Sequence, residues 1–198
     1  MKSKIDIKTV GVREMIELTE KKTKREVIYD GKVLRVVKDA VELPNGNSAV
    51  REFCMHIGAV CVIPVLDDGR VIMERQYRYP HGRVFFEIPA GKLDFSGEDP
   101  LSAAKRELRE ETGGVAKSYT FLGELDTTPA ITDEKIRMYL AEDITFCERE
   151  LDEDEFINLE LVPLSELYKM VMSGEIKDAK TQIAVLKVWQ IREKYRNM

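Results

Sequence analysis

Apolar and polar positions along the chain predict a run of strands, one central helix and two helices near the C-terminus. Short alternating or continuous apolar stretches, separated by Gly, Pro and Asn, are typical of strands, whereas apolar residues three and four apart indicate helices. The pattern predicts strands over 31–43, 48–56, 58–66, 71–78, 83–91, 118–125, 135–142 and 156–162, and helices over 100–112, 164–174 and 181–195. The Pro-Asn-Gly-Asn stretch at 44–47 indicates a tight hairpin turn between the first two strands.

This order of elements predicts a single α+β (or α/β) fold in which strands surround one central helix and two terminal helices. Residues 1–25 are polar and weakly patterned, so they are expected to form a partly ordered arm. We therefore predict an N-terminal arm and antiparallel β-hairpin over residues 1–50 and a main domain over residues 51–198.

Composition narrows the class of protein. The 198 residues are 43% hydrophobic and 34% charged, and the net charge of −5 gives no reason to expect nucleic acid or an anionic membrane as partner. The apolar run at 58–66 is too short to cross a bilayer, and the charged N-terminal stretch lacks the apolar centre of a signal peptide. The three cysteines show no paired spacing, which predicts a reducing, cytoplasmic setting. Because the chain has only two histidines, any metal is expected to be held by oxygen ligands.

The central helix carries an unusual group of carboxylates. Asp99 and Pro100 suit its first turn, and Gly113 suits a left-handed stop at its end. Between them, at about 100° per residue, three glutamates fall within an arc of roughly 100° beside the apolar stripe of the helix. They are Glu107, Glu110 and Glu111.

Two interpretations of these glutamates are open. They can form a solvated helix face on which Arg106 and Arg109 relieve the repulsion, which is what such runs usually are. Alternatively, they can bind a divalent cation, because Mg²⁺ and Mn²⁺ prefer small groups of carboxylate oxygens close to phosphates.

The surrounding sequence favours the cation. The stretch "EIPAGKLDFSGEDPLSAAKRELREETGG" (87–114) resembles the Nudix box, in which a glycine, a distant glutamate and an Arg-Glu-hydrophobic-any-Glu-Glu-any-Gly core have fixed spacing. The matching residues are Gly91, Glu98, Arg106, Glu107, Leu108, Glu110, Glu111 and Gly113. Six residues instead of five separate Gly91 from Glu98, and Gly114 stands at the final hydrophobic position; neither departure changes the spacing within the helix.

The resemblance implies a Nudix-type mixed β-sheet sandwiched between α-helices and the hydrolysis of a nucleoside diphosphate linked to another group. It assigns Mg²⁺, with Mn²⁺ as a possible substitute, to Glu107, Glu110, Glu111 and the carbonyl of Ala90. Arg106 would orient the glutamates through salt bridges, and Gly91 would let the backbone turn close to the metal.

Further segments resemble the ADP-ribose pyrophosphatase branch of this family. Pro129 follows Gly113 by sixteen residues, as in that branch. In "ERQYRYP" (74–80), Arg78 is expected to meet the phosphates or ribose of the substrate, and in "FEIPAG" (86–91), Glu87 is expected to contact the terminal ribose. Each has a simpler alternative as an ordinary loop or strand residue, and their joint order favours the resemblance.

The same resemblance implies a homodimer with exchanged N-terminal strands. Arg51 would then reach the nucleotide bound by the other subunit. Tyr29 is the candidate to stack on the adenine, although a core position at the start of a strand is an equally good explanation for this aromatic residue.

The general base is expected in the acidic segment "ERELDEDE" (148–155), most of which is predicted to be a solvated loop. Alignment of "DEFINL" (154–159) with the pattern of the branch favours Glu155, and Glu153 is the close alternative. The predicted reaction is Mg²⁺-dependent hydrolysis of ADP-ribose to AMP and ribose 5-phosphate. The alternatives are hydrolysis of another nucleotide sugar such as GDP-mannose, and a sensor that binds ADP-ribose without cutting it.

Overall fold

In a computed structural model of the chain, residues 16–151, 153 and 155–196 are described, and they form two compact units that divide between Cys54 and Met55. The smaller unit holds β1 (Lys21–Asp30), β2 (Arg35–Glu42) and β3 (Ser48–Met55), the last of which runs into the boundary. The larger unit holds β4 (Ala59–Pro64), β5 (Arg70–Arg78), β6 (Arg83–Glu87), β7 (Ala90–Lys92), α1 (Pro100–Thr112), β8 (Gly114–Asp126), β9 (Lys135–Phe146), β10 (Ile157–Pro163), α2 (Leu164–Met172) and α3 (Ala179–Arg196).

The N-terminal unit is a three-stranded sheet in the order β1-β2-β3, with β1 antiparallel to β2. The Asn-Gly turn forms as predicted, with Gly46 at φ +82° and the N–H of Leu43 donating to the carbonyl of Asn47 (2.8 Å). Strand β1 corrects the prediction of a weakly ordered arm as far as residue 25, since regular pairing already begins at Lys21. Nearly all of β1 faces solvent, so its pairing leaves no apolar alternation in the sequence. Residues 1–15 of the predicted arm lie outside the described residues.

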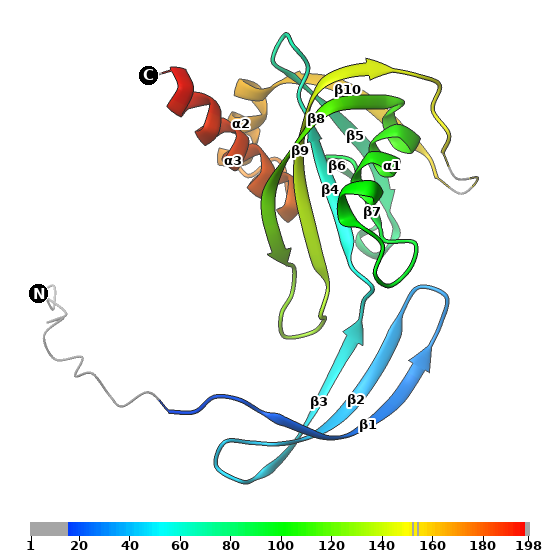
Figure 1. Cartoon of the computed structure of the whole chain (residues 1–198), viewed down its shortest axis with the longest axis vertical. Coiled ribbons are helices and arrows are strands. Elements are labelled where there is room, and N and C mark those ends of the chain that lie inside the picture. The colour runs from blue at the N-terminus through cyan, green and yellow to red at the C-terminus, as the bar shows by residue number, and fades with distance from the viewer. Residues whose placement is uncertain (1–15, 152, 154, 197–198) are drawn as a thin grey trace, which may run out of the picture. The chain divides into compact units, whose positions relative to one another are not determined.

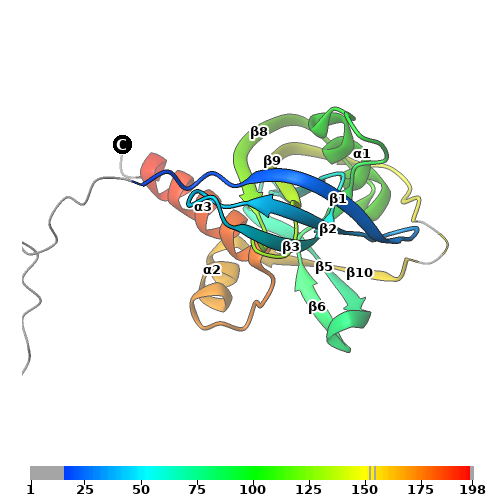
Figure 2. The ribbon, with the colours of Figure 1, turned by 90° about the horizontal axis from the view of Figure 1, so that it is seen from below.

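The larger unit contains a mixed sheet between helices. Its four strands run in the order β7-β4-β9-β8, with β4 and β9 parallel and the other neighbours antiparallel. A second, antiparallel sheet has the order β10-β5-β6. Figure 2 shows β5 and β6 side by side, joined by the tight turn at Tyr79–His81.

Strand β4 sits at the centre because its side chains alternate between two apolar cores. Cys61 and Ile63 pack on the side covered by α2 and α3, whereas Val60 and Val62 pack on the side covered by α1. All four are fully buried, which contributes roughly 1.5–3 kcal/mol for each large aliphatic side chain. Figure 1 shows α1 and α3 on opposite faces of this sheet, so the predicted sheet sandwiched between helices is confirmed.

One expected strand is divided in two. The sequence predicted a continuous strand over 83–91, but β6 pairs with β5 in one sheet and β7 pairs with β4 in the other. Between them, Pro89 accepts a hydrogen bond from the N–H of Val62 (2.9 Å), and the N–H of Ile88 donates to the hydroxyl of Thr181 at the start of α3 (3.0 Å). Because of this change of sheet, Glu87 lies opposite Glu74 on β5, whereas Gly91 lies opposite Val60 on β4.

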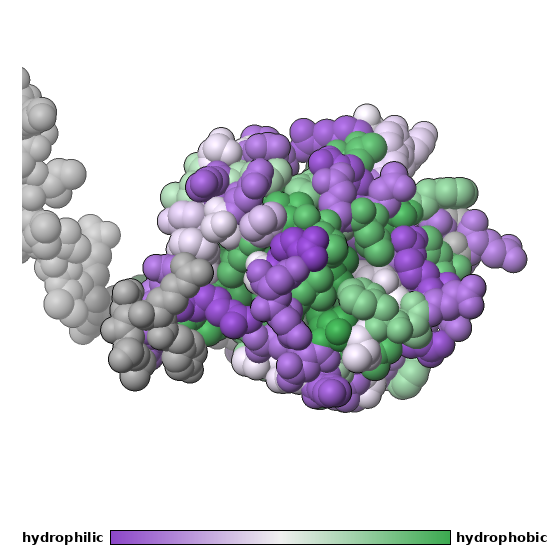
Figure 3. Space-filling model, turned by 90° about the horizontal axis from the view of Figure 1, so that it is seen from above, coloured by the Kyte–Doolittle hydropathy of each residue, from purple (hydrophilic) through white to green (hydrophobic). Residues whose placement is uncertain are grey.

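The face of the molecule seen in Figure 3 has apolar patches that are separated by polar side chains. A hollow of about 670 Å³ lies between the β4–β5 turn, the second half of β9, the β10–α2 junction and the C-terminal half of α3, and residues of α1 do not line it. The α1 carboxylates therefore lie outside this hollow. None of the helices in the described residues has an apolar stretch long enough to cross a bilayer.

Candidate active site

Helix α1 begins and ends where the sequence predicts. The Asp99 carboxylate accepts hydrogen bonds from the N–H and the hydroxyl of Ser102 (2.9 and 2.8 Å), which caps the first turn. Gly113 is left-handed at φ +73°, and its N–H closes the last turn on the carbonyl of Arg109 (2.8 Å). Ala104 and Leu108 are fully buried against the sheet, and this fixes the rotation of the helix.

The three glutamates of α1 differ in exposure in step with their position around the helix. Glu111 is 3% exposed, and one of its carboxylate oxygens accepts a hydrogen bond from the backbone N–H of Ala90 (2.9 Å). The side chain of Glu107 is 12% exposed and that of Glu110 is 37% exposed. The group therefore extends from the interior beside β7 outward to solvent.

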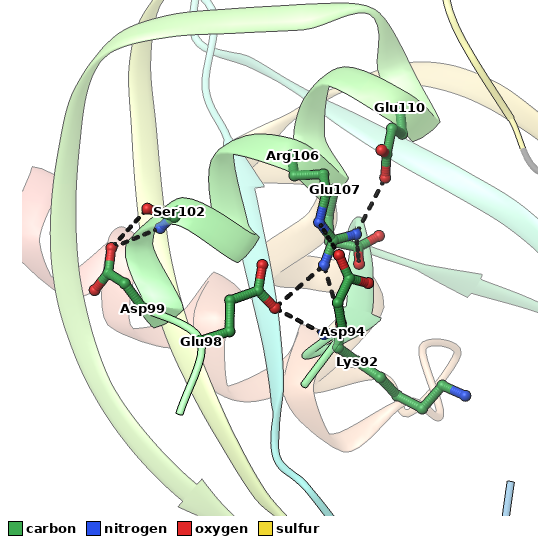
Figure 4. A network of polar contacts seen from close by, with 8 residues as sticks. All are labelled: Lys92, Asp94, Glu98, Asp99, Ser102, Arg106, Glu107 and Glu110. Carbon is green, nitrogen blue, oxygen red and sulfur yellow. Dashed lines mark hydrogen bonds and ion pairs between the residues drawn. The ribbon is translucent and has the colours of Figure 1, made fainter. Parts of the chain in front are cut away.

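Arg106 lies at the centre of a polar network beside these glutamates (Figure 4). Its Nη1 donates to Glu107 Oε1 (2.7 Å) and Glu110 Oε2 (3.2 Å). The same guanidinium lies 3.2 Å from an Asp94 oxygen and 3.6 Å from Glu98 Oε2, and it donates to the carbonyl of Lys92 (3.2 Å). The Arg106 guanidinium thus binds both ends of the loop before α1 and two carboxylates of the helix.

Glu98 keeps a clear position despite the additional residue in its loop. Its Oε2 accepts a hydrogen bond from the N–H of Asp94 (2.7 Å) and faces Arg106. Gly97, at φ +92°, turns the backbone just before it. Glu98 therefore belongs to the network that orders the loop.

Gly91 is required by the close approach of Glu107. A Cβ atom at this position would lie 2.1 Å from the carboxylate carbon of Glu107, a distance that side chains do not tolerate. The glycine lets β7 pass close to the carboxylate of Glu107, and its predicted role in bringing the backbone close to a metal stays a prediction.

Burial strongly perturbs the carboxylates at this place. Desolvation raises the pKa of Glu107 to about 7, against the opposing charge of Arg106. Desolvation, followed by the charge of Glu74, raises the pKa of Glu111 well above its ordinary value. Desolvation and then Glu87 raise the pKa of Glu74, which is 1% exposed. Like charges confined in a poorly solvated place favour proton uptake or a bound cation.

Glu74 is a buried site residue that was not predicted from the sequence. The alternation of strand β5 places Glu74 and Arg78 on one face, and the pairing of β5 with β6 puts Glu74 directly opposite Glu87. The three apolar residues before Glu74 indicate a buried strand, so a glutamate at its end was the available signal.

Glu87 is almost fully buried and is neutralised by two cations. Arg78 Nε donates to one of its oxygens (2.7 Å), and Lys180 Nζ donates to the other. Lys180 is itself buried and also lies 3.1 Å from Asp178. Negative and positive side chains thus alternate in this network. The sequence gives no signal for the pairing of Lys180 with Glu87, because the two residues are 93 positions apart.

The predicted contact of Glu87 with a ribose stays a prediction. Both of its oxygens are engaged, and the side chain is 2% exposed. The Arg78 side chain is 38% exposed and shares this carboxylate, so it is the member of the pair that can reach a ligand.

The acidic segment after β9 returns to α1. The N–H of Glu150 donates to the carbonyl of Glu110 (3.3 Å), and its side chain pairs with Arg109 (2.9 Å). The charge of Glu155 acts on both Glu107 and Glu111 and helps to raise the pKa of each. Of the two candidate bases, Glu155 is thus the one with a described interaction with the α1 carboxylates.

Tyr29 and Arg51 belong to the N-terminal unit. Tyr29 is 57% exposed on β1. Arg51 Nε donates to Glu20 (2.9 Å) in the same unit. Their roles toward a nucleotide stay predictions.

The carboxylate oxygens of this site are suitable ligands for a hard divalent cation, although they do not point toward one common position in this structure. Among the described residues, no three His, Cys, Asp or Glu side chains stand together as a ready set of metal ligands, because Glu107 and Glu110 turn toward Arg106. The oxygen-rich donor set, the buried Glu74 Oε1 without a hydrogen-bond partner and the close approach at Gly91 all suit Mg²⁺ or Mn²⁺.

Comparisons with known proteins agree with this geometry. The NUDIX domain family matches residues 55–183, so the chain belongs to the Nudix family, as its sequence predicted. The chain is 46% identical over 173 residues to the ADP-ribose pyrophosphatase of Bacillus subtilis, covering 86% of this chain and 93% of the relative. It is 42% identical over 174 residues to a methanol dehydrogenase activator of Bacillus methanolicus, covering 86% and 94%.

A solved structure supports the same fold. The crystal structure of an ADP compounds hydrolase superposes with a TM-score of 0.80 at 25% sequence identity, covering 90% of this chain and 97% of that chain. The predicted Nudix fold and the resemblance to the ADP-ribose pyrophosphatase branch are therefore confirmed.

Proposed function

We propose that this protein is a Mg²⁺-dependent pyrophosphatase that hydrolyses ADP-ribose to AMP and ribose 5-phosphate. The observation that carries the proposal is the partly buried carboxylate group of α1, held next to Gly91 and organised by Arg106. The 46% identity to an ADP-ribose pyrophosphatase over most of the chain supports the choice of substrate. In the reaction, water forms a bond to one phosphorus, and the bridging P–O bond breaks.

Glu107, Glu110, Glu111 and the carbonyl of Ala90 would hold the cation, with Mn²⁺ as a possible substitute. When bound, such an ion neutralises diphosphate charge and makes a coordinated water more acidic. Arg106 positions Glu107 and Glu110 through its two hydrogen bonds.

Glu155 is the proposed general base, with Glu153 as the alternative. It would accept the proton of the attacking water, because its segment is anchored on α1 and its charge reaches Glu107 and Glu111. Arg78 would bind the phosphates or ribose, since its guanidinium is held by the buried Glu87 and remains partly exposed.

We also propose a homodimer in which the N-terminal unit serves the site of the other subunit through Arg51 and Tyr29. Exposed apolar side chains on this unit support an interface there, because a folded domain rarely leaves such a group uncovered. They are Val27, Ile28, Tyr29, Val33, Leu34 and Val50. A cytoplasmic location is proposed from the free cysteines Cys54, Cys61 and Cys147.

A substrate panel tests the proposal. ADP-ribose, GDP-mannose, NADH and a diadenosine polyphosphate are compared at equal concentration with millimolar Mg²⁺, and kcat/KM is measured for each. ADP-ribose should be preferred by at least about tenfold, and EDTA should abolish its cleavage. Preference for another nucleotide sugar would contradict the choice of substrate. Tight ADP-ribose binding without cleavage would instead indicate the sensor.

A further inference from the structure

Glu74 is a buried glutamate with an oxygen that nothing in the described residues satisfies. It is 1% exposed on β5, and its Oε1 is buried without a hydrogen-bond partner. Buried carboxyl oxygens are nearly always hydrogen-bonded, because leaving one unpaired forfeits its hydration without replacement. Glu74 therefore needs an explanation that packing alone does not give.

The neighbours of Glu74 differ sharply in how their charge is compensated. Glu87, directly across the β5–β6 pair, is bonded to both Arg78 and Lys180. Glu111 is buried with the charge of Glu74 acting on it and has only the Ala90 N–H as a described hydrogen-bond donor. Glu74 on β5 and Glu111 on α1 are thus two buried carboxyls with few hydrogen bonds, and the charge of Glu74 acts on Glu111.

Between two such carboxyls, a divalent cation would satisfy the unpaired oxygen and cancel the repulsion at once. Carboxylate oxygens from different elements are the usual ligands of Mg²⁺ and Mn²⁺. Arg78 and Lys180 bind Glu87, and neither donates a hydrogen bond to Glu74 Oε1.

We propose that Glu74 supplies a further carboxylate to the divalent-cation site, from strand β5 of the second sheet. This inference rests on the proposed function, because it assumes that Glu107, Glu110 and Glu111 hold the cation. It adds a ligand outside the motif of the helix and ties metal binding to the packing of β5.

The test is a Mn²⁺-binding titration of the full chain, in which electron paramagnetic resonance measures the concentration of free Mn²⁺. Wild type is compared with Glu74→Gln, which keeps the shape but removes the anionic oxygen. Glu160→Gln is the matched control, because Glu160 lies on β10 next to β5 and forms an exposed pair with Arg75. Glu111→Gln serves as the reference for loss of a proposed ligand.

Glu74→Gln should weaken Mn²⁺ binding about 10- to 100-fold, while Glu160→Gln stays within about twofold of wild type. If Glu111→Gln weakens binding and Glu74→Gln does not, the inference is wrong and the proposed metal site stands. If wild type binds no Mn²⁺ at this site, both the inference and the proposed metal site are wrong.

Thermal unfolding gives a second readout that does not depend on turnover. Without added metal, Glu74→Gln should melt close to the wild-type temperature, because glutamine keeps the shape of the buried side chain. With saturating Mg²⁺, its melting temperature should rise less than that of wild type. An equal rise in both proteins would overturn the proposal, and an equal baseline would show that the variant folds.

Discussion

Lys180 provides a quantitative test of how the candidate site is built. Its ammonium group is buried, and it bonds to Glu87 and Asp178 at the start of α3. Burial by itself would lower the pKa of Lys180, but Asp178 and Glu87 outweigh it, so the net shift is upward and the lysine is charged at neutral pH. Replacement by methionine keeps most of the aliphatic stem and removes the charge.

The cost of Lys180→Met follows from what it leaves behind. Breaking a buried ion pair by removing one partner typically costs about 3–5 kcal/mol, since the other charge stays buried. Arg78 retains one oxygen of Glu87 (2.7 Å), so the cost should lie just below this range, at about 2–3 kcal/mol. For a chain of this size, that corresponds to a fall in melting temperature of roughly 4–12 °C.

Urea unfolding followed by circular dichroism measures this difference. Lys177→Met is the matched control, because Lys177 is exposed three residues earlier, and its loss should change stability by less than about 0.5 kcal/mol. The double variant Glu87→Gln/Lys180→Met should be less destabilised than the sum of the single variants. Equal stabilities for Lys180→Met and Lys177→Met would refute the reasoning.

Three further predictions concern the carboxylates. Gly91→Ala should lower activity at least about tenfold while changing the melting temperature little, because the new Cβ displaces the flexible end of Glu107; a large loss of stability would show a structural role instead. Glu155→Gln should lower kcat about 10²–10⁴-fold and Glu153→Gln less than about fivefold, and the reverse order would identify Glu153 as the base. In EDTA, the free energy of unfolding should fall as pH rises from about 5 to 8, by up to about 1.4 kcal/mol per pH unit for each proton taken up on folding.

The sign of this pH dependence follows from the raised pKa values. The unfolded chain releases the proton of a glutamate near pH 4.3, whereas the folded protein holds the Glu107 proton until about pH 7 and that of Glu111 still higher. The stabilising contribution is complete below the unfolded pKa and is lost as pH rises. Unfolding in urea at each pH, with and without Mg²⁺, checks it, and a stability that rises over this range in EDTA would contradict the assignment.

Local signals carried much of the fold and part of the site. The ends of α1 follow from Asp99, Pro100 and Gly113, because caps and left-handed stops depend on neighbouring residues alone. The order of the strands and the placement of the glutamates beside the buried stripe followed in the same way. Arg106 was expected to bind these glutamates, and the structure gives it Glu107 and Glu110.

Features that depend on distant residues could not be predicted. Strand β1 has no apolar alternation because both of its faces are exposed. It forms by pairing with β2, which its own sequence does not indicate. The division of 83–91 into two strands depends on which sheet each half joins. Lys180 and Glu74 became candidates only when the fold placed them beside Glu87 and Glu111.

The most direct test of the central claim is the rate of AMP formation from ADP-ribose with millimolar Mg²⁺, measured for wild type and for Glu111→Gln. Wild type should cleave ADP-ribose in a reaction that EDTA abolishes, and the variant should lose about 100-fold or more of this rate with an unchanged circular dichroism spectrum. Equal rates in the two proteins would contradict the carboxylate site on α1.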